Sequence, residues 1–272
     1  MKEQLENVKK KRPLIHNITN YVTVNDVANM ILAVGASPIM ADDEGEVEEI
    51  TSICNGLNIN IGTLNHRTIQ SMIKAGKKAN ELNHLVLLDP VGVGASTLRT
   101  QTALKLIEEV QFSVIRGNIS EIKTLALNQG NTHGVDESEM DAVTQDNLEQ
   151  NVAFVKEYAQ KMNAIIAVTG AIDLVSDGKE CYVIYNGEKE MSAITGTGCQ
   201  LSGLMTAYIT ANPKTPLKAC VAAVCQMGLA GEIAKTHLQS FEGNATYRNR
   251  IIDAVNHMDG YILQAGAKYE IK

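Results

Sequence analysis

The amino-acid sequence predicts an α/β fold with a mainly parallel central sheet and helices on both faces. Short apolar runs alternate with amphipathic stretches, a pattern typical of strand–helix–strand units whose strands run parallel. Two further runs, at 172–178 and 181–187, flank a Ser-Asp-Gly-Lys turn and predict a hairpin. From Cys199 onward the pattern is almost entirely helical.

The strands expected before the hairpin are short, apolar and bounded by turn-forming residues. In order they are 13–18 (PLIHNI), 36–40 (ASPIM), 56–62 (GLNINIG), 84–89 (HLVLLD), 112–117 (FSVIRG) and 163–170 (NAIIAVTG). The helices expected between them carry apolar residues at helical spacing. They are 21–35, 65–82, 96–110 and 147–162.

The chain is expected to form a single domain over residues 1–272. No internal repeat, low-complexity tract or Pro/Gly/Ser-rich linker divides it. A length of 272 residues is compatible with one large α/β domain, which leaves enough chain to bury a sizeable core.

Composition and charge narrow the class of protein. Hydrophobic residues make up 44% and charged residues 20% of the chain, as in ordinary globular proteins. The net charge of −7, without a long basic block, argues against nucleic acid or a membrane surface as the main partner. No segment reaches the roughly 18–20 apolar residues of a membrane span. Five scattered cysteines without a Cys-x-x-Cys pair argue against disulfides and a zinc ribbon, so we expect a cytoplasmic protein with reduced thiols.

Polar side chains stand where several of the predicted strands end. Asp89 closes LVLLD, Arg116 lies at the end of FSVIRG, and Thr169 follows IIAV. Asn118 and Glu121 then share one side of an opening helical turn. Each has a structural alternative, such as a turn former or a helix cap with its capping-box partner. Together, however, two carboxylates and an arginine at the ligand-binding edge of a parallel sheet suit an anionic, metal-bridged ligand.

A glycine-rich turn, ITGTGCQLSG at 194–203, precedes a predicted buried helix. Gly196 and Gly198 permit positive φ and close backbone approach. The first N–H groups of the helix lack intrahelical partners, so Gly196, Thr197 and Gly198 are predicted to form an anion hole for a phosphoryl group in transfer. Cys199 follows directly. It is a candidate base, because a helix N-terminus can lower the pKa of a thiol, or alternatively a small buried hydrophobe.

Two common phosphate-binding motifs are absent from the sequence. There is no G-x-x-x-x-G-K-[ST], and no G-x-G-x-x-G opens an N-terminal βαβ unit. The segments VLLDPVGVGAS, VIRGNISEI, AVTGAIDLVSDG and ITGTGCQLSG, with the N-terminal HNITNYVTVNDVANMILAVGASPIMAD, instead resemble the hydroxyethylthiazole kinases of the ribokinase-like superfamily. The resemblance covers nearly the entire chain, in the expected order.

This resemblance implies a ribokinase-like fold and a particular reaction. ATP would phosphorylate the hydroxyl of 4-methyl-5-(2-hydroxyethyl)thiazole, in thiamine biosynthesis and salvage, with Mg²⁺ as cofactor. Asp89 and Glu121 match positions that organise magnesium and its waters, consistent with the oxygen ligands that this ion prefers. Arg116 and Thr169 match positions that contact the nucleotide.

The resemblance also implies residues for the acceptor alcohol. Gly196 and Met40 match substrate-contacting positions, and Asn25 lies in the segment that lines the thiazole pocket. Such kinases form homotrimers with sites at subunit boundaries, so Met40 would serve a neighbour's site. The wider superfamily usually has an Asp base after the glycine turn, whereas this chain has Cys199, as thiazole kinases do. Because phosphoryl transfer is loose, the thiol could act mainly by shaping the pocket.

Three other functions stay open at this point. The first is a kinase for a related small alcohol such as a hydroxymethylpyrimidine. The second is a hydrolase or transferase with Cys199 as nucleophile, which would need a histidine base that no sequence feature indicates. The third is a noncatalytic nucleotide sensor, which the presence of Asp89, Glu121 and the complete glycine turn does not favour.

Overall fold

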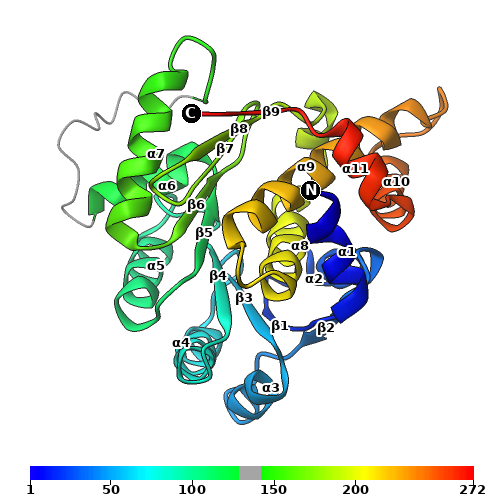
Figure 1. The fold of residues 1–272 in the computed structure, drawn as a ribbon. Coiled ribbons are helices and arrows are strands. Elements are labelled where there is room, and N and C mark those ends of the chain that lie inside the picture. Colours follow the sequence, from blue (N-terminus) through cyan, green and yellow to red (C-terminus); the bar gives the residue numbers. More distant parts are fainter. Residues whose placement is uncertain (129–141) are drawn as a thin grey trace.

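The computed structural model describes residues 1–128 and 142–272, and its centre is one continuous sheet (Figure 1). The strand order is β2-β1-β3-β4-β5-β6-β7-β8-β9. The first six strands along the chain pair in parallel, and β7 to β9 add an antiparallel extension at one edge. The strands are β1 (Leu14–Ile18), β2 (Ser37–Met40), β3 (Gly56–Asn60), β4 (Leu85–Asp89), β5 (Val114–Gly117), β6 (Ile165–Val168), β7 (Asp173–Ser176), β8 (Cys181–Ile184) and β9 (Tyr269–Ile271).

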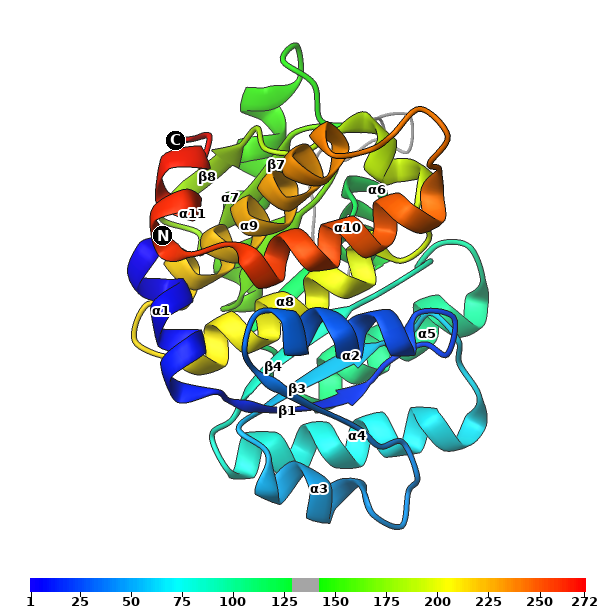
Figure 2. The same cartoon turned by 90° about the vertical axis from the view of Figure 1, so that its right-hand side faces the viewer.

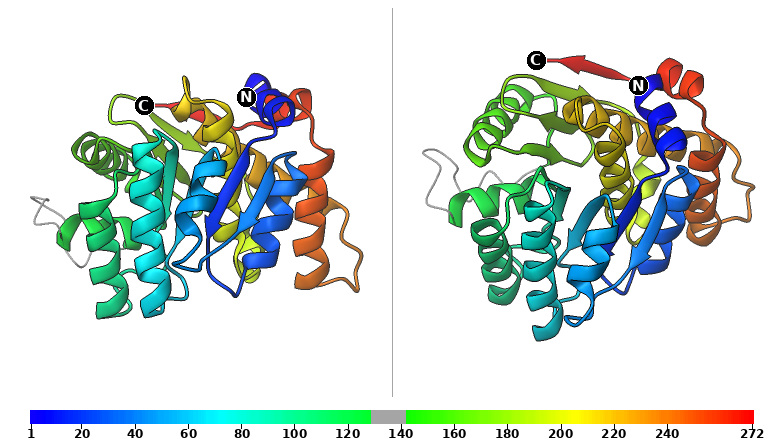
Figure 3. Two further views of the ribbon diagram at one scale, coloured as in Figure 1. Left: turned by 90° about the horizontal axis from the view of Figure 1, so that it is seen from below. Right: turned by 60° about the horizontal axis from the view of Figure 1, so that its bottom comes forward.

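Helices cover both faces of this sheet (Figure 3). One face carries α3 (Val47–Ile53), α4 (His66–Glu81), α5 (Thr97–Glu109), α6 (Ile119–Asn128) and α7 (Leu148–Met162). The other carries α1 (Lys2–Lys11), α2 (Val24–Ala33), α8 (Thr197–Ala211), α9 (Pro216–Thr236), α10 (Asn244–His257) and α11 (Gly260–Gly266). Figure 2 shows α2, α8 and α10 on this second face. A short 3-10 helix, η2 (Lys189–Ala193), precedes α8.

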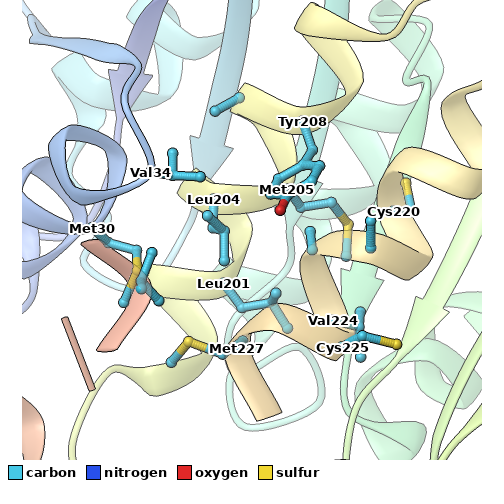
Figure 4. Close-up of a cluster of buried hydrophobic side chains, with 14 of the residues drawn as sticks. Met30, Val34, Leu201, Leu204, Met205, Tyr208, Cys220, Val224, Cys225 and Met227 are labelled. Atoms are coloured by element: carbon cyan, nitrogen blue, oxygen red, sulfur yellow. The ribbon is translucent and has the colours of Figure 1, made fainter. Parts of the chain in front are cut away.

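Each face of the sheet has its own apolar core. The core beneath α4 to α7 is built on the apolar strand residues that point that way, such as Leu57 and Leu88. The core on the other face joins α2, α8 and α9 and includes Met30, Met205 and Tyr208, which Figure 4 shows in close-up. The strands are therefore covered on both faces, which is why they are recognisable as nearly continuous apolar runs.

Among the described helices, α9 is long and apolar enough to cross a membrane by length and composition alone. However, 83% of its most apolar window is buried. It packs against α8, α10 and the antiparallel strands β7 and β8. The apolar character of α9 is thus that of a central core helix.

The eight strands expected from the sequence are all present, with their ends trimmed by one to several residues. The hairpin is confirmed as β7 and β8, which pair in antiparallel register through Asp173 and Ile184. The sequence did not predict β9, a strand of three exposed residues at the sheet edge. The single-domain organisation stays a prediction.

Candidate active site

The carboxyl ends of β3, β4, β5 and β6 meet the N-terminus of α8 at one edge of the sheet. At the end of β4 lies Asp89, whose side chain is fully buried. Its Oδ2 accepts hydrogen bonds from Asn60 Nδ2 and Ser202 Oγ, both at 2.8 Å, and lies 3.6 Å from Arg116 Nη1. Burial raises the pKa of Asp89, and the Arg116 charge opposes that rise.

The other carboxylate oxygen of Asp89, Oδ1, is buried and has no hydrogen-bond partner in the described parts of the chain. An unpartnered buried carboxylate oxygen is costly unless a ligand satisfies it. A hard cation or its water shell has the right chemistry, so this residue fits the magnesium that the resemblance implies.

Glu121 lies at the start of α6, where it also caps the helix. Its Oε2 accepts from Asn118 N at 2.9 Å, while Asn118 Oδ1 accepts from Glu121 N at 2.8 Å, so the capping-box alternative is correct for this pair. Oε1 accepts from Gly92 N at 2.8 Å, in the loop after Asp89. Both oxygens therefore already receive one backbone N–H, and Glu121 suits a role toward magnesium-bound water better than direct ligation.

The structure brings Arg116 and Thr169 together, as predicted. Arg116 Nη2 donates to Thr169 Oγ1, and the guanidinium lies over the start of α8. A Cβ built on Gly198 would fall 2.6 Å from Arg116 Nη1, so only glycine permits this approach. The positive guanidinium and the free N–H groups of the helix start therefore point to the same small region.

Gly196 is the residue immediately before α8 and has a φ of +90°, a conformation that favours glycine. A Cβ there would also overlap the side chain of Thr23, which lies just before α2. No side chain caps the helix, so its first N–H groups are left for another partner. The predicted anion hole of Gly196, Thr197 and Gly198 has the required backbone geometry.

A cavity of about 900 Å³ opens beside this region. Its polar lining includes Arg116, Asn118, Thr169, Thr197 and Gly198. Its apolar lining includes Met191, Leu201, Val224 and Met227, three of which are labelled in Figure 4. The lining thus combines polar and cationic groups with apolar ones, as suits a ligand with a phosphate tail and an aromatic head.

Asp173 also lines the cavity, and the sequence analysis did not identify it. Its Oδ1 accepts from Gly170 N at 2.8 Å. Burial raises the pKa of Asp173 to about 7. Its position at the beginning of β7, directly after the Thr169-Gly170 turn, was the signal that could have indicated it.

Cys199 lies on α8, is 8% exposed as a residue, and faces two side-chain amides. Asn20 Nδ2 and Asn60 Nδ2 lie 3.1 and 3.3 Å from Sγ. The amide orientations are determined by backbone donors: Asn20 Oδ1 accepts from Thr23 N at 3.1 Å, and Asn60 Oδ1 accepts from Gly62 N at 2.9 Å. The sulfur therefore acts as a hydrogen-bond acceptor, and Asn60 connects it to Asp89.

The expected lowering of the thiol pKa at the helix start is wrong for this residue. Burial and the nearby Asp89 charge raise the pKa of Cys199, and hydrogen bonds from neighbouring polar side chains offset that only in part. The thiol is thus protonated at neutral pH, which favours a pocket-shaping role over that of a strong base. Its hydrogen-bond partners in the described chain are the amides of Asn20 and Asn60 and the side chain of Thr23 rather than an imidazole, which gives a nucleophile mechanism no support.

The predicted substrate contacts Met40 and Asn25 lie on β2 and at the start of α2. Met40 ends the edge strand β2 and is partly buried against the core of α2 and α8. Asn25 is exposed on the first turn of α2. Neither residue lines the 900 Å³ cavity.

The overall architecture resembles solved structures of small-molecule kinases. Pyridoxal kinase from Staphylococcus aureus, in complex with AMP-PCP and pyridoxal, superposes with a TM-score of 0.59 at 15% identity, covering 96% of this chain and 98% of that one. At this identity the likeness concerns the fold alone. The fold is therefore that of the ribokinase-like kinases, as predicted.

More similar proteins define the family. The model of the hydroxyethylthiazole kinase family matches residues 5–260. A hydroxyethylthiazole kinase from Clostridium acetobutylicum is 62% identical over 270 residues, 99% of each chain. The structure of a hydroxyethylthiazole kinase from Pyrococcus horikoshii OT3 superposes with a TM-score of 0.89 at 34% identity, covering 100% of this chain and 98% of that one. The chain belongs to the hydroxyethylthiazole kinase family.

Proposed function

We propose that the protein transfers the γ-phosphoryl group of ATP to the hydroxyl of 4-methyl-5-(2-hydroxyethyl)thiazole, a step in thiamine biosynthesis and salvage. The observation that carries the proposal is that Arg116 and the first residues of α8, Thr197 and Gly198, line one cavity, while Asp89 lies directly behind Arg116, 3.6 Å from its Nη1. Family membership supports the choice of acceptor alcohol.

In this reaction the alcohol oxygen forms a bond to the γ-phosphorus, and the bond from phosphorus to the β,γ-bridging oxygen breaks. The hydroxyl proton leaves late, because the transition state is loose. Most of the catalysis is then positioning and charge stabilisation. Arg116 and the N–H groups of 197–199 would balance the charge on the phosphoryl oxygens, and Thr169 holds Arg116 in place.

Magnesium would be held by Asp89 and, through its waters, by Glu121. The ion neutralises phosphate charge and orients the nucleotide. Asn60 and Ser202 keep the Asp89 carboxylate in one orientation by donating to the same oxygen, which leaves Oδ1 for the ion or its waters.

Cys199 is proposed to orient the acceptor hydroxyl. The amides of Asn20 and Asn60 donate to the sulfur, and the Thr23 side chain also hydrogen-bonds it, so the thiol has a fixed position against which an alcohol can be held. Gly196 would contact the substrate from the neighbouring turn.

We also propose a cytoplasmic homotrimer in which Met40 and Asn25 line the thiazole pocket of a neighbouring subunit. Met40 lies on β2, the strand at one edge of the sheet, and Tyr21 and Val22, in the loop between β1 and α2, are 77% and 60% exposed. Analytical ultracentrifugation should give three times the chain mass. A fully active monomer would contradict the shared site.

The experiment that tests the activity is an ADP-release assay over a panel of thiazole, pyrimidine and sugar alcohols, with and without Mg²⁺. The proposal expects release with the thiazole alcohol and Mg²⁺ and little with sugars. Faster release with a hydroxymethylpyrimidine would favour that alternative kinase. No release with any alcohol, alongside normal ATP binding, would favour the nucleotide sensor.

A further inference from the structure

One wall of the cavity is a loop, residues 186–189, that has no role in the proposed phosphoryl transfer. Asn186, Gly187, Glu188 and Lys189 follow β8, lead into η2, and line the cavity. This loop follows the antiparallel strands β7 and β8, whereas Asp89 ends the parallel strand β4. Their position is determined by residues outside the cavity, on α9 and at the C-terminal end of the chain.

Asn186 is 7% exposed, and every polar group of its side chain is occupied. Oδ1 accepts from Lys268 N at 2.8 Å, which determines the amide orientation, because a backbone N–H only donates. Nδ2 donates to Glu232 Oε1 at 3.0 Å and to Gly266 O at 2.9 Å. The side chain therefore ties the loop to α9 and to the segment between α11 and β9.

The carboxylate of Glu232, on α9, accepts hydrogen bonds both from the loop and from Lys268 in the C-terminal segment. Its Oε1 accepts from Gly187 N at 2.9 Å as well as from Asn186, and its Oε2 accepts from Lys268 Nζ at 2.7 Å. Burial alone would raise the pKa of Glu232, but these hydrogen bonds outweigh burial and lower it. The carboxylate is therefore charged, and charge-assisted hydrogen bonds are the stronger kind.

The loop also lies in direct contact with the α9 backbone. A Cβ built on Gly228, one turn before Glu232, would fall 2.7 Å from the backbone carbon and oxygen of Asn186. A Cβ on Gly231 would overlap the sulfur of Met191, another cavity-lining residue. The two glycines allow the loop and η2 to rest on the helix, while Asn186 and Glu232 hold them there.

We infer that Asn186, Glu232 and Lys268 form a clasp that positions the wall of the nucleotide cavity around the base and sugar of ATP. The apolar residues Met191 and Met227 also line the cavity. Met191 packs on Gly231 and Met227 directly precedes Gly228, on which the loop rests, so an aromatic base would pack beside the loop. The inference rests on the proposed function in that the cavity takes ATP. The C-terminal segment, which supplies Lys268, thereby becomes part of the nucleotide site. The three clasp residues have no role in binding the alcohol.

The test uses AMP-PCP binding by calorimetry together with steady-state kinetics on the full-length protein. Glu232→Gln keeps the shape of the side chain but presents an amide N–H to Lys268 or to the loop. We expect its Kd for AMP-PCP and its KM for ATP to rise about fivefold, as a preorganised wall is lost. The value of kcat and the KM for the thiazole alcohol should stay within about twofold.

A second variant keeps the result interpretable if Glu232→Gln folds poorly. Lys268→Met removes the exposed partner only, and we expect a smaller rise, about twofold, because an exposed ion pair contributes little. The double variant should bind no worse than Glu232→Gln alone, since both changes break one connection. Lys272→Met is the matched control: it lies in the same segment and pairs with Glu149, outside the clasp.

Unchanged AMP-PCP affinity in a folded Glu232→Gln protein would overturn the inference. So would equal rises in KM for both substrates, which would indicate a general loss of structure. The proposed function fails differently: the wild-type protein would then bind no AMP-PCP or would release no ADP with the thiazole alcohol.

Discussion

Replacing Asp89 with asparagine separates the catalytic role of this carboxylate from its structural role. In Asp89→Asn, the amide oxygen can still accept from Asn60 and Ser202, while the amide nitrogen takes the place of the unpartnered Oδ1. The change removes a buried charge and the oxygen assigned to magnesium. Arg116 keeps its hydrogen bond to Thr169.

The substitution should affect stability less than turnover. At an effective dielectric constant of about 20, the charges of Asp89 and Arg116, 3.6 Å apart, attract each other by about 5 kcal/mol. Desolvation of the carboxylate offsets this attraction. Because burial raises the pKa of Asp89 despite Arg116, the charged form adds no net stability, and the free energy of unfolding should change by no more than about 2 kcal/mol. Turnover should fall about 10²- to 10⁴-fold, because charge stabilisation of the transferring group is lost.

The assay is ADP release with the thiazole alcohol over a range of Mg²⁺ concentrations, alongside urea unfolding of the same preparation. Asp177→Asn is the matched control, the same chemical change on the exposed hairpin turn between β7 and β8. Turnover within about tenfold of wild type in a folded Asp89→Asn protein would refute the assignment.

Three further predictions concern the surroundings of Asp89 and the cavity. Cys199→Asp should keep or raise kcat, because Asn20 and Asn60 already direct N–H groups at this position, and an inactive but folded variant would count against it. Asn60→Asp replaces an amide nitrogen 2.8 Å from Asp89 with a carboxylate oxygen, and repulsion between the two carboxylates should lower kcat about tenfold or more. Unchanged kinetics would show that the Asn60 amide does not position Asp89. The folded-state pKa of Asp173, about 7, lies above the unfolded value, so the folded protein binds this proton more tightly and loses stability as pH rises from about 4 to 7. Asp173→Asn should therefore be more stable than wild type at pH 8, by about 1–2 kcal/mol, but not at pH 4, and equal unfolding midpoints at both pH values would exclude this.

Much of the fold could be predicted because the strands are buried on both faces. LVLLD is a nearly continuous apolar run and GLNIN alternates apolar residues with asparagines, and the order of such strands with intervening helices predicts parallel pairing. β9 could not be found in this way, because its three residues are exposed and belong to a sheet edge that only the folded chain creates. The same holds for the clasp, which joins residues 82 positions apart in sequence.

The candidate site was predictable where it depends on strand ends. Asp89, Arg116 and Thr169 meet because parallel strands end at one edge, and the glycine turn adds the helix start. The amides around Cys199 were not found, although an asparagine at the end of a buried strand, Asn60, is a visible signal, because a buried amide has many structural uses. The thiol pKa was expected in the wrong direction, because burial and the Asp89 charge arise only from tertiary packing.

The most direct measurement of the central claim is a crystal structure with AMP-PCP and Mg²⁺ bound. The account predicts the terminal phosphate within about 3.5 Å of the backbone nitrogens of residues 197–199 and of Arg116, with the metal beside Asp89. A terminal phosphate bound elsewhere in the cavity, away from the start of α8, would contradict it.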